Sequence, residues 1–323
     1  TAGIPLPQGA LTDLSKLRIV DGSGNTVPAQ FKALNRWWWE KNKIGVATPS
    51  AKWVLCDFQV PNIQSKSIEP FTIKDDNTVN TVSNMQVTDG TDKITVSTGS
   101  LKFTISKQHF NLFDELWLDA NANGSFETTE QMITSNMQNG GAITAGDWVA
   151  GECISGTIHR TSLTAPIKVS IEEQGALKVI IKAEGRHYAA ANGVSRGLFG
   201  YEVYITAYAG KSYVDVQWLI TNYTLLGGPP SAKYQGISWP FRNYSINVMF
   251  NLNTTAQQYS ILGSSEVTGF LASTDTIALL QKSGKYTLTN SSSGTYAKGG
   301  AMLTDGNLGV MVGMRDFAPN SPK

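Results

Sequence analysis

The chain has 323 residues, a formal net charge of +1 and only 16% charged residues. This near-neutral balance leaves no basic footprint for a nucleic-acid partner. No run of 18 apolar residues occurs, so we expect no membrane-spanning helix. A chain of this length is expected to fold as one large or two medium domains without needing a disulfide or a metal.

Residues 1–75 predict a first β domain. Leu17–Val20 forms a predicted strand, Asp21–Asn25 is rich in turn residues, and Trp53–Phe58 is a second strongly apolar strand. Gln59–Glu69 is interpreted as a linker or crossover that leads into a second domain over residues 76–323.

Trp37, Trp38 and Trp39 follow one another directly. Neighbouring residues of a strand point to opposite faces, so the three rings cannot share one core. One interpretation is a carbohydrate-binding platform, because an aromatic face suits the C–H face of a sugar ring. The other is packing between domains.

The second domain is organised around residues 177–220. Tyr201, Val203 and Ile205 alternate with polar residues, and Val214 begins a similar pattern. Period-2 alternation broken by glycine predicts consecutive antiparallel strands. Further strands are predicted at Lys93–Val96, Leu101–Ser106, Leu116–Asp119, Ile167–Ile171, Gly236–Phe250, Ala278–Gln281, Tyr286–Thr289, Ala301–Thr304 and Gly309–Met314.

Helical periodicity is confined to two short candidates, Leu11–Leu17 and Thr128–Met137. Many short strands with Gly-rich turns and almost no helix predict an all-β protein built as a sandwich or barrel. The two cysteines, Cys56 and Cys153, leave a single disulfide open, although a buried free cysteine also packs as a small apolar residue.

A twelve-residue stretch from Asp119 to Glu130 has the oxygen spacing of a calcium loop. Asp119, Asn121, Asn123, Glu127 and Glu130 occupy positions 1, 3, 5, 9 and 12, and a glycine lies at position 6. The loop therefore predicts a Ca²⁺ site of reduced charge. An Asn-Gly hairpin turn explains the same residues without a metal.

Two basic clusters could carry chemistry. His159 is followed by Arg160, and Arg186, His187 and Tyr188 are consecutive. If adjacent strands bring them together, arginine can neutralise a carboxylate while histidine or tyrosine moves a proton. The alternative is that these residues lie at strand ends and pair locally. We expect the Arg-His-Tyr cluster to face outward.

Several ordered stretches resemble the exo-rhamnogalacturonan lyase family, a group of bacterial pectin-degrading proteins that includes YetA-like members. The resemblance is carried by residues 3–11, 17–22, 27–31, 52–58, 184–187 and 309–317. It implies a small RIFT-type β-barrel, then a large antiparallel β-sandwich, and then a helical toroid. The toroid is missing from this sequence, so we expect two β domains cut from a longer protein.

The resemblance also implies a secreted or cell-surface protein that cleaves rhamnogalacturonan-type acidic polysaccharide by β-elimination. Arg186, His187 and Tyr188 are then the candidate catalytic residues, and Trp37, Trp38, Trp39 and Arg160 are candidates for binding the sugar. The competing hypothesis is a non-catalytic structural or adhesive module of an extracellular assembly. Its partners would be neighbouring protein subunits that add to open strand edges.

Overall fold

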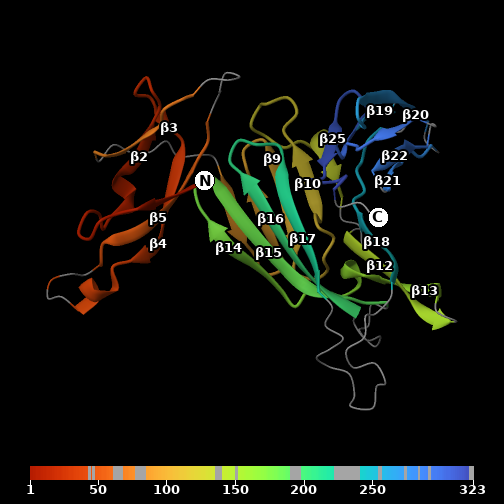
Figure 1. Cartoon of the computed structure of the whole chain (residues 1–323), viewed down its shortest axis with the longest axis horizontal. Helices are drawn as coiled ribbons and strands as arrows, with labels where there is room; N and C mark the ends of the chain where they lie inside the picture. The colour runs from red at the N-terminus through yellow and green to blue at the C-terminus, as the bar shows by residue number, and fades with distance from the viewer. Residues whose placement is uncertain are drawn as a thin grey trace, which may run out of the picture. The chain divides into compact units, whose positions relative to one another are not determined.

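The computed structural model describes residues 1–42, 45, 48–60, 68–76, 85–134, 140–149, 152–189, 198–221, 241–253, 257–272, 275–282, 284–289 and 292–319. Over these residues the chain is all-β, as predicted, and its strands pair antiparallel (Figure 1). None of the helical elements in this part of the chain is long and apolar enough to cross a membrane.

The chain divides into two compact units, each of which is discontinuous in sequence. The first contains Thr1–Asp114 and Asn136–Val248, and the second contains Glu115–Ser135 and Met249–Lys323. The predicted domain boundary near residue 75 falls inside the first unit. That boundary, and the RIFT-type barrel expected before it, stay predictions.

The N-terminal strands of the first unit form two three-stranded sheets. The first sheet has the order β1 (Ala2–Pro5), β5 (Ala51–Phe58), β4 (Ala29–Arg36). The second sheet has the order β3 (Thr26–Val27), β2 (Leu17–Val20), β6 (Thr72–Asp75). The predicted strands at Leu17 and Trp53 are confirmed. Asp21 closes the predicted turn by accepting hydrogen bonds from the backbone N–H groups of Ser23 and Asn25.

Two further sheets of the first unit supply the sandwich core. One contains β7 (Gln86–Asp89), β8 (Lys93–Ser97) and β9 (Leu101–Ser106), and the other has the order β14 (Lys168–Gln174), β15 (Lys178–His187), β16 (Leu198–Tyr208), β17 (Val214–Thr221). Alternate residues of β8, β15 and β16 are almost completely buried, and β9 is buried on both faces from Phe103 to Ser106. This period-2 burial confirms the antiparallel meander that the alternation in residues 177–220 predicted.

A third sheet of this unit has the order β13 (Glu152–Arg160), β12 (Gly140–Val149), β18 (Phe241–Asn247). Strands β12 and β13 were not predicted, because glycine and threonine interrupt the apolar alternation along both of them. Gly200 lies inside β16, where it pairs with Thr221.

The second unit contains β10 (Glu115–Leu118), β11 (Gln131–Ile133) and two small sheets. One of these sheets has the order β20 (Glu266–Leu271), β19 (Gln257–Leu262), β24 (Gly300–Thr304), β25 (Gly309–Gly313). The other has the order β21 (Leu279–Lys282), β22 (Lys285–Leu288), β23 (Ser293–Thr295). A small core around Ile261, Tyr286 and Leu288 holds these two sheets together.

Helical structure in the described residues is limited to four 3₁₀ turns, η1 (Leu14–Lys16), η2 (Trp38–Asn42), η3 (Thr128–Glu130) and η4 (Thr161–Leu163). The two helices proposed from periodicity are therefore shorter than expected. Part of the second, residues 135–137, lies outside the described residues.

Candidate functional site

The two basic clusters meet at one strand end. The backbone N–H of Arg160 donates to the carbonyl of Tyr188 over 2.8 Å, and the N–H of Tyr188 donates back to Arg160 over 3.0 Å. Residues that are directly paired in this way carry their side chains on the same face. The bridge thus joins the ends of β13 and β15, which is the arrangement that the chemical interpretation of the two clusters requires.

Strand alternation separates Arg186 from His187. Arg186 is exposed, His187 is completely buried, and Tyr188 is half-buried. The expectation of an outward-facing cluster is right for Arg186 and wrong for His187. The reason is that His187 falls on the same face of β15 as Val179, Ile181 and Ala183, which line the core.

Both ring nitrogens of His187 have partners. Nδ1 lies 2.9 Å from the carbonyl oxygen of Phe199, and Nε2 lies 3.3 Å from the hydroxyl of Tyr244. A carbonyl can only accept, so Nδ1 carries the proton and the Tyr244 hydroxyl donates to Nε2. Burial lowers the pKa of His187 from 6.5 to about 4, partly opposed by the bond to Phe199. The ring is therefore neutral near pH 7.

Aromatic rings enclose His187. It meets Tyr201 and Tyr244 edge-on, each at 79°, with centroids 5.5 and 5.6 Å away. Phe110 stacks on Tyr201, and Trp218 packs against Phe110, Tyr201 and Tyr244. The Tyr201 hydroxyl has no hydrogen-bond partner among the described residues, and burial raises its pKa strongly.

Gly141 on β12 makes this ring packing possible. A Cβ at this position would lie 2.6 Å from the Tyr244 hydroxyl, 2.7 Å from Trp218 and 3.1 Å from His187 Nε2. Gly141, Trp218 and Tyr244 were not predicted as members of this site. Their role depends on β12, β17 and β18 meeting, which no local pattern reveals.

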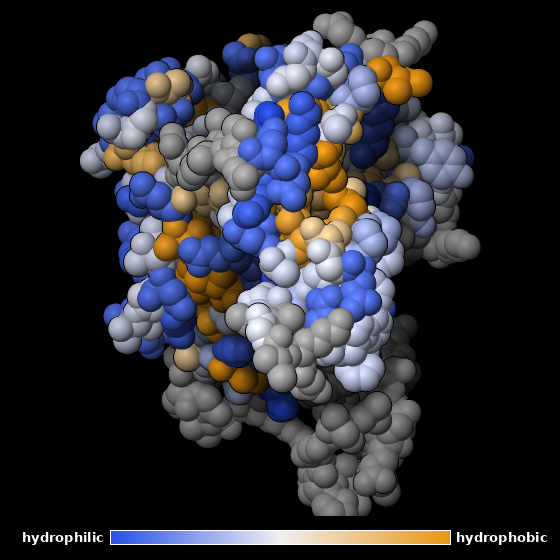
Figure 2. Space-filling model, turned by 90° about the vertical axis from the view of Figure 1, so that its left-hand side faces the viewer, coloured by the Kyte–Doolittle hydropathy of each residue, from blue (hydrophilic) through white to orange (hydrophobic). Residues whose placement is uncertain are grey.

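The three consecutive tryptophans lie around η2. Trp38 is 74% exposed and Trp39 is 38% exposed, whereas Trp37 packs against Trp39 and under the Lys52 ammonium. Their rings are tilted by 52° and 79°, so they do not form the coplanar stack that a flat sugar platform would need. Trp53, which is 42% exposed, adds a further solvent-exposed aromatic ring. Figure 2 shows the side of the molecule that carries the N-terminal strands, where apolar residues lie in patches between polar ones.

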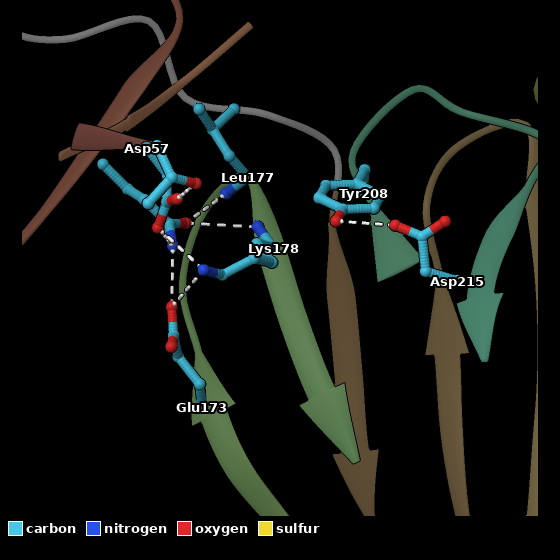
Figure 3. Close-up of polar contacts among 8 residues, drawn as sticks. Asp57, Glu173, Leu177, Lys178, Tyr208 and Asp215 are labelled. Carbon is cyan, nitrogen blue, oxygen red and sulfur yellow. Dashed lines mark hydrogen bonds and ion pairs between the residues drawn. The ribbon is translucent and has the colours of Figure 1, made fainter. Parts of the chain in front are cut away.

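A buried polar cluster joins β5 to the β14–β15 hairpin (Figure 3). Lys178 Nζ lies 2.9 Å from Asp57 and 3.0 Å from Glu173. The side-chain oxygen of Gln30 accepts the backbone N–H groups of Leu177 and Lys178. One ammonium thus compensates two carboxylates, and the sheet of β4 and β5 is fixed to the sandwich hairpin.

Asp57 in this cluster stays ionised in spite of its surroundings. Burial alone would raise the pKa of Asp57, but hydrogen bonds from Thr1 and Lys178 outweigh it and hold the pKa below its usual range. The adjacent Cys56 is a free, buried thiol whose pKa burial raises to about 11. The disulfide left open by the sequence is therefore not formed, and the Cys153 side chain lies outside the described residues.

In the loop from Asp119 to Glu130, side-chain oxygens accept hydrogen bonds from the loop's own backbone. Asp119 accepts the N–H groups of Asn123 and Gly124, and buried Glu130 accepts that of Ala120. The Asn123 amide donates to Glu127 and is the main cause of the lowered Glu127 pKa, and the Asn121 amide also donates to Glu127. No group of three His, Cys, Asp or Glu side chains in the described residues is placed to hold a metal ion. Ca²⁺ binding by this loop stays a prediction.

Residues 85–222 match the family model of the PcRGLX-like protein central beta sandwich domain. The matched span runs from β7 to the end of β17 and includes Arg160, Arg186, His187 and Tyr188. No curated protein gives a significant match to the chain. The match supports a family-level relation of this β-sandwich to rhamnogalacturonan lyase-like proteins.

Proposed function

We propose that this chain is the β-domain part of a secreted or cell-surface lyase-like protein that acts on rhamnogalacturonan-type acidic polysaccharide. The observation that carries the proposal is the pairing of Arg160 with Tyr188 inside the matched sandwich. The backbone pairing sets Arg160 and Tyr188 opposite each other on one face, and the exposed Arg186 is two residues from Tyr188 in the chain.

These side chains suit β-elimination on a uronate. The reaction removes the C5 proton next to the carboxylate, expels the oxygen at C4 and leaves a C4–C5 double bond. Arg160 and Arg186 can neutralise the carboxylate and stabilise the enolate-like charge that develops on it. The Tyr188 hydroxyl both accepts and donates, so it is our candidate for proton transfer.

His187 has a supporting role in this proposal. Its ring is buried and hydrogen-bonded to Phe199 and Tyr244, so it holds the strand end in place behind Tyr188. The catalytic role suggested for His187 by sequence is thereby given to Tyr188, the half-buried member of the cluster.

The experiment follows ultraviolet absorbance of the unsaturated product on rhamnogalacturonan. Tyr188→Phe should reduce kcat by about 100-fold or more. Arg160→Ala and Arg186→Ala should both reduce kcat and raise KM. Exposed Arg315 in the second unit supplies the matched control, Arg315→Ala, which should leave both constants unchanged. Wild-type rates in all three site variants would reject the assignment.

A second candidate function is a non-catalytic module of an extracellular assembly. The complete burial of His187, with both ring nitrogens engaged, is the observation that favours it. This candidate predicts no unsaturated product from wild-type protein at any pH. Binding to the polysaccharide without elimination would then separate a sugar-binding module from a purely structural one.

A further inference from the structure

Strand β25 is the open edge of the β20-β19-β24-β25 sheet, drawn in blue in Figure 1. One side of β25 pairs with β24 from Gly300↔Gly313 to Thr304↔Gly309. In the part of the chain that the structure describes, no strand pairs with its other side. Its outward backbone N–H and C=O groups are therefore able to receive another strand.

The side chains of β25 are apolar on both faces. Met311 is 74% exposed and Val312 is 58% exposed, and as neighbours in a strand they point to opposite faces. Such a continuous apolar run is typical of a strand whose two faces are both covered, whereas here residues on both faces are exposed.

Other edges of the molecule carry the charges that normally prevent edge-to-edge pairing. Lys168 lies on β14, Asp215 on β17 and Glu266 on β20, which is the opposite edge of the same sheet. From Leu308 to Met314 there is no charged residue and no proline. The edge formed by β25 therefore lacks both a neighbouring strand, among the described residues, and the charged or proline residues that would block one.

The sequence of β25 identifies what can pair with it. Residues 309–313 read Gly-Val-Met-Val-Gly, which is the same in both directions. We propose that β25 pairs antiparallel with β25 of a second copy of this chain, about a twofold axis at Met311. Met311 then faces its own copy, Val310 faces Val312, and Gly309 faces Gly313, with no like charges opposed.

The pairing extends patterns already present in the sheet. Met302 on β24 is opposite Met311 on β25, so the dimer forms one row of four methionines across the junction. The two four-stranded sheets become one continuous sheet of eight strands. Because strand pairing alone buries a small area, we expect a weak dimer whose population depends on protein concentration.

Sedimentation velocity over a range of concentrations tests the proposal. Wild type should shift from monomer to dimer, and Met311→Lys should raise the dissociation constant more than about tenfold because it opposes two ammonium groups. The matched control is Phe270→Lys, since Phe270 is 75% exposed on β20 at the other edge. A monomer at every concentration, or equal weakening by both variants, would overturn the proposal.

A crosslinking experiment tests the register. Antiparallel partners have Cα atoms about 4.5–5.5 Å apart, which lies within the span of a disulfide. In a Cys153→Ser background, Met311→Cys should give a covalent dimer on mild oxidation, and Phe270→Cys should not. Failure of Met311→Cys to crosslink, or slow reaction of its thiol with a maleimide because another segment covers it, contradicts the proposal.

Discussion

A neutral, buried imidazole makes the stability of this protein depend on pH. Unfolded histidine has a pKa near 6.5, whereas burial lowers the pKa of His187 to about 4. The unfolded chain therefore binds more protons between these values, and folding stability falls as the pH falls from 6.5 toward 4. From pH 7 to pH 5 we expect His187 to cost about 2 kcal/mol, measured by urea unfolding.

His187→Gln separates this contribution from that of the carboxylates. The variant loses the titrating ring, so its unfolding free energy should fall less between pH 7 and pH 5. Parallel pH profiles for wild type and variant would show that His187 is not held neutral in the folded protein.

Gly141→Ala should destabilise the fold although it adds only one methyl group. The new Cβ would lie against Trp218 and Tyr244, at contact distances that force the rings to move. Overpacking of this kind costs about 1–3 kcal/mol. Gly3→Ala is the control because no atom lies within 4 Å of its added Cβ. Equal midpoints of thermal unfolding for the two variants would contradict the packing described for Gly141.

At the scale of elements, Lys178 connects β5 with the β14–β15 hairpin. Lys178→Met would leave Asp57 and Glu173 buried together without their cation, and we expect a loss of about 3 kcal/mol in the free energy of unfolding. Lys182→Met is the matched control on the same strand, because Lys182 pairs with Glu184 and Glu202 at the surface. It should change stability little. Similar losses in both variants would mean that burial of Lys178 does not set its contribution.

The elements that the sequence predicted best are those whose alternation is strong and local. The β15–β17 meander is an example, because each apolar residue faces the core independently of distant strands. β12 and β13 were not predicted because glycines and polar residues interrupt their apolar alternation, and the partners of these residues come from strands that are distant in sequence. Gly141 is the extreme case, since its function is to leave room for rings from β15, β17 and β18.

The candidate site could be predicted in part for the same reason. Their residue types singled out Arg160 and Tyr188 in the sequence, and in the structure an isolated bridge pairs them at the ends of β13 and β15. The sequence did not reveal which face of β15 would be buried at the C-terminal end of this strand. A residue there lies inside or outside according to whether another sheet covers it, and here the ring of Tyr244, from β18, covers His187.

At the scale of the whole molecule, the proposed function assigns polysaccharide binding to two exposed side chains of the first unit. Trp38 is exposed near η2, and Arg186 is exposed at the end of β15. A polysaccharide that engages both side chains should bind more weakly when either is removed, and the double variant should lose far more than each single one. Affinity electrophoresis of Trp38→Ala, Arg186→Ala and the double variant in rhamnogalacturonan gels measures this.

Two controls make the binding measurement specific. Phe270→Ala removes an equally exposed ring from the second unit and should leave migration unchanged. Carboxyl-reduced polysaccharide should remove the contribution of Arg186 but keep that of Trp38. Retardation that is the same in all variants would place polymer binding elsewhere on the chain.

The exposed methionines at the edge of the second unit have a chemical consequence. Met302, Met311 and Met314 are 40%, 74% and 58% exposed, so peroxide can reach their thioether sulfurs. Oxidation turns each into a polar sulfoxide, which methionine sulfoxide reductases can reverse. In an oxidising environment, the surface formed by β24, β25 and Met314 would therefore become more polar with time and bind apolar partners more weakly.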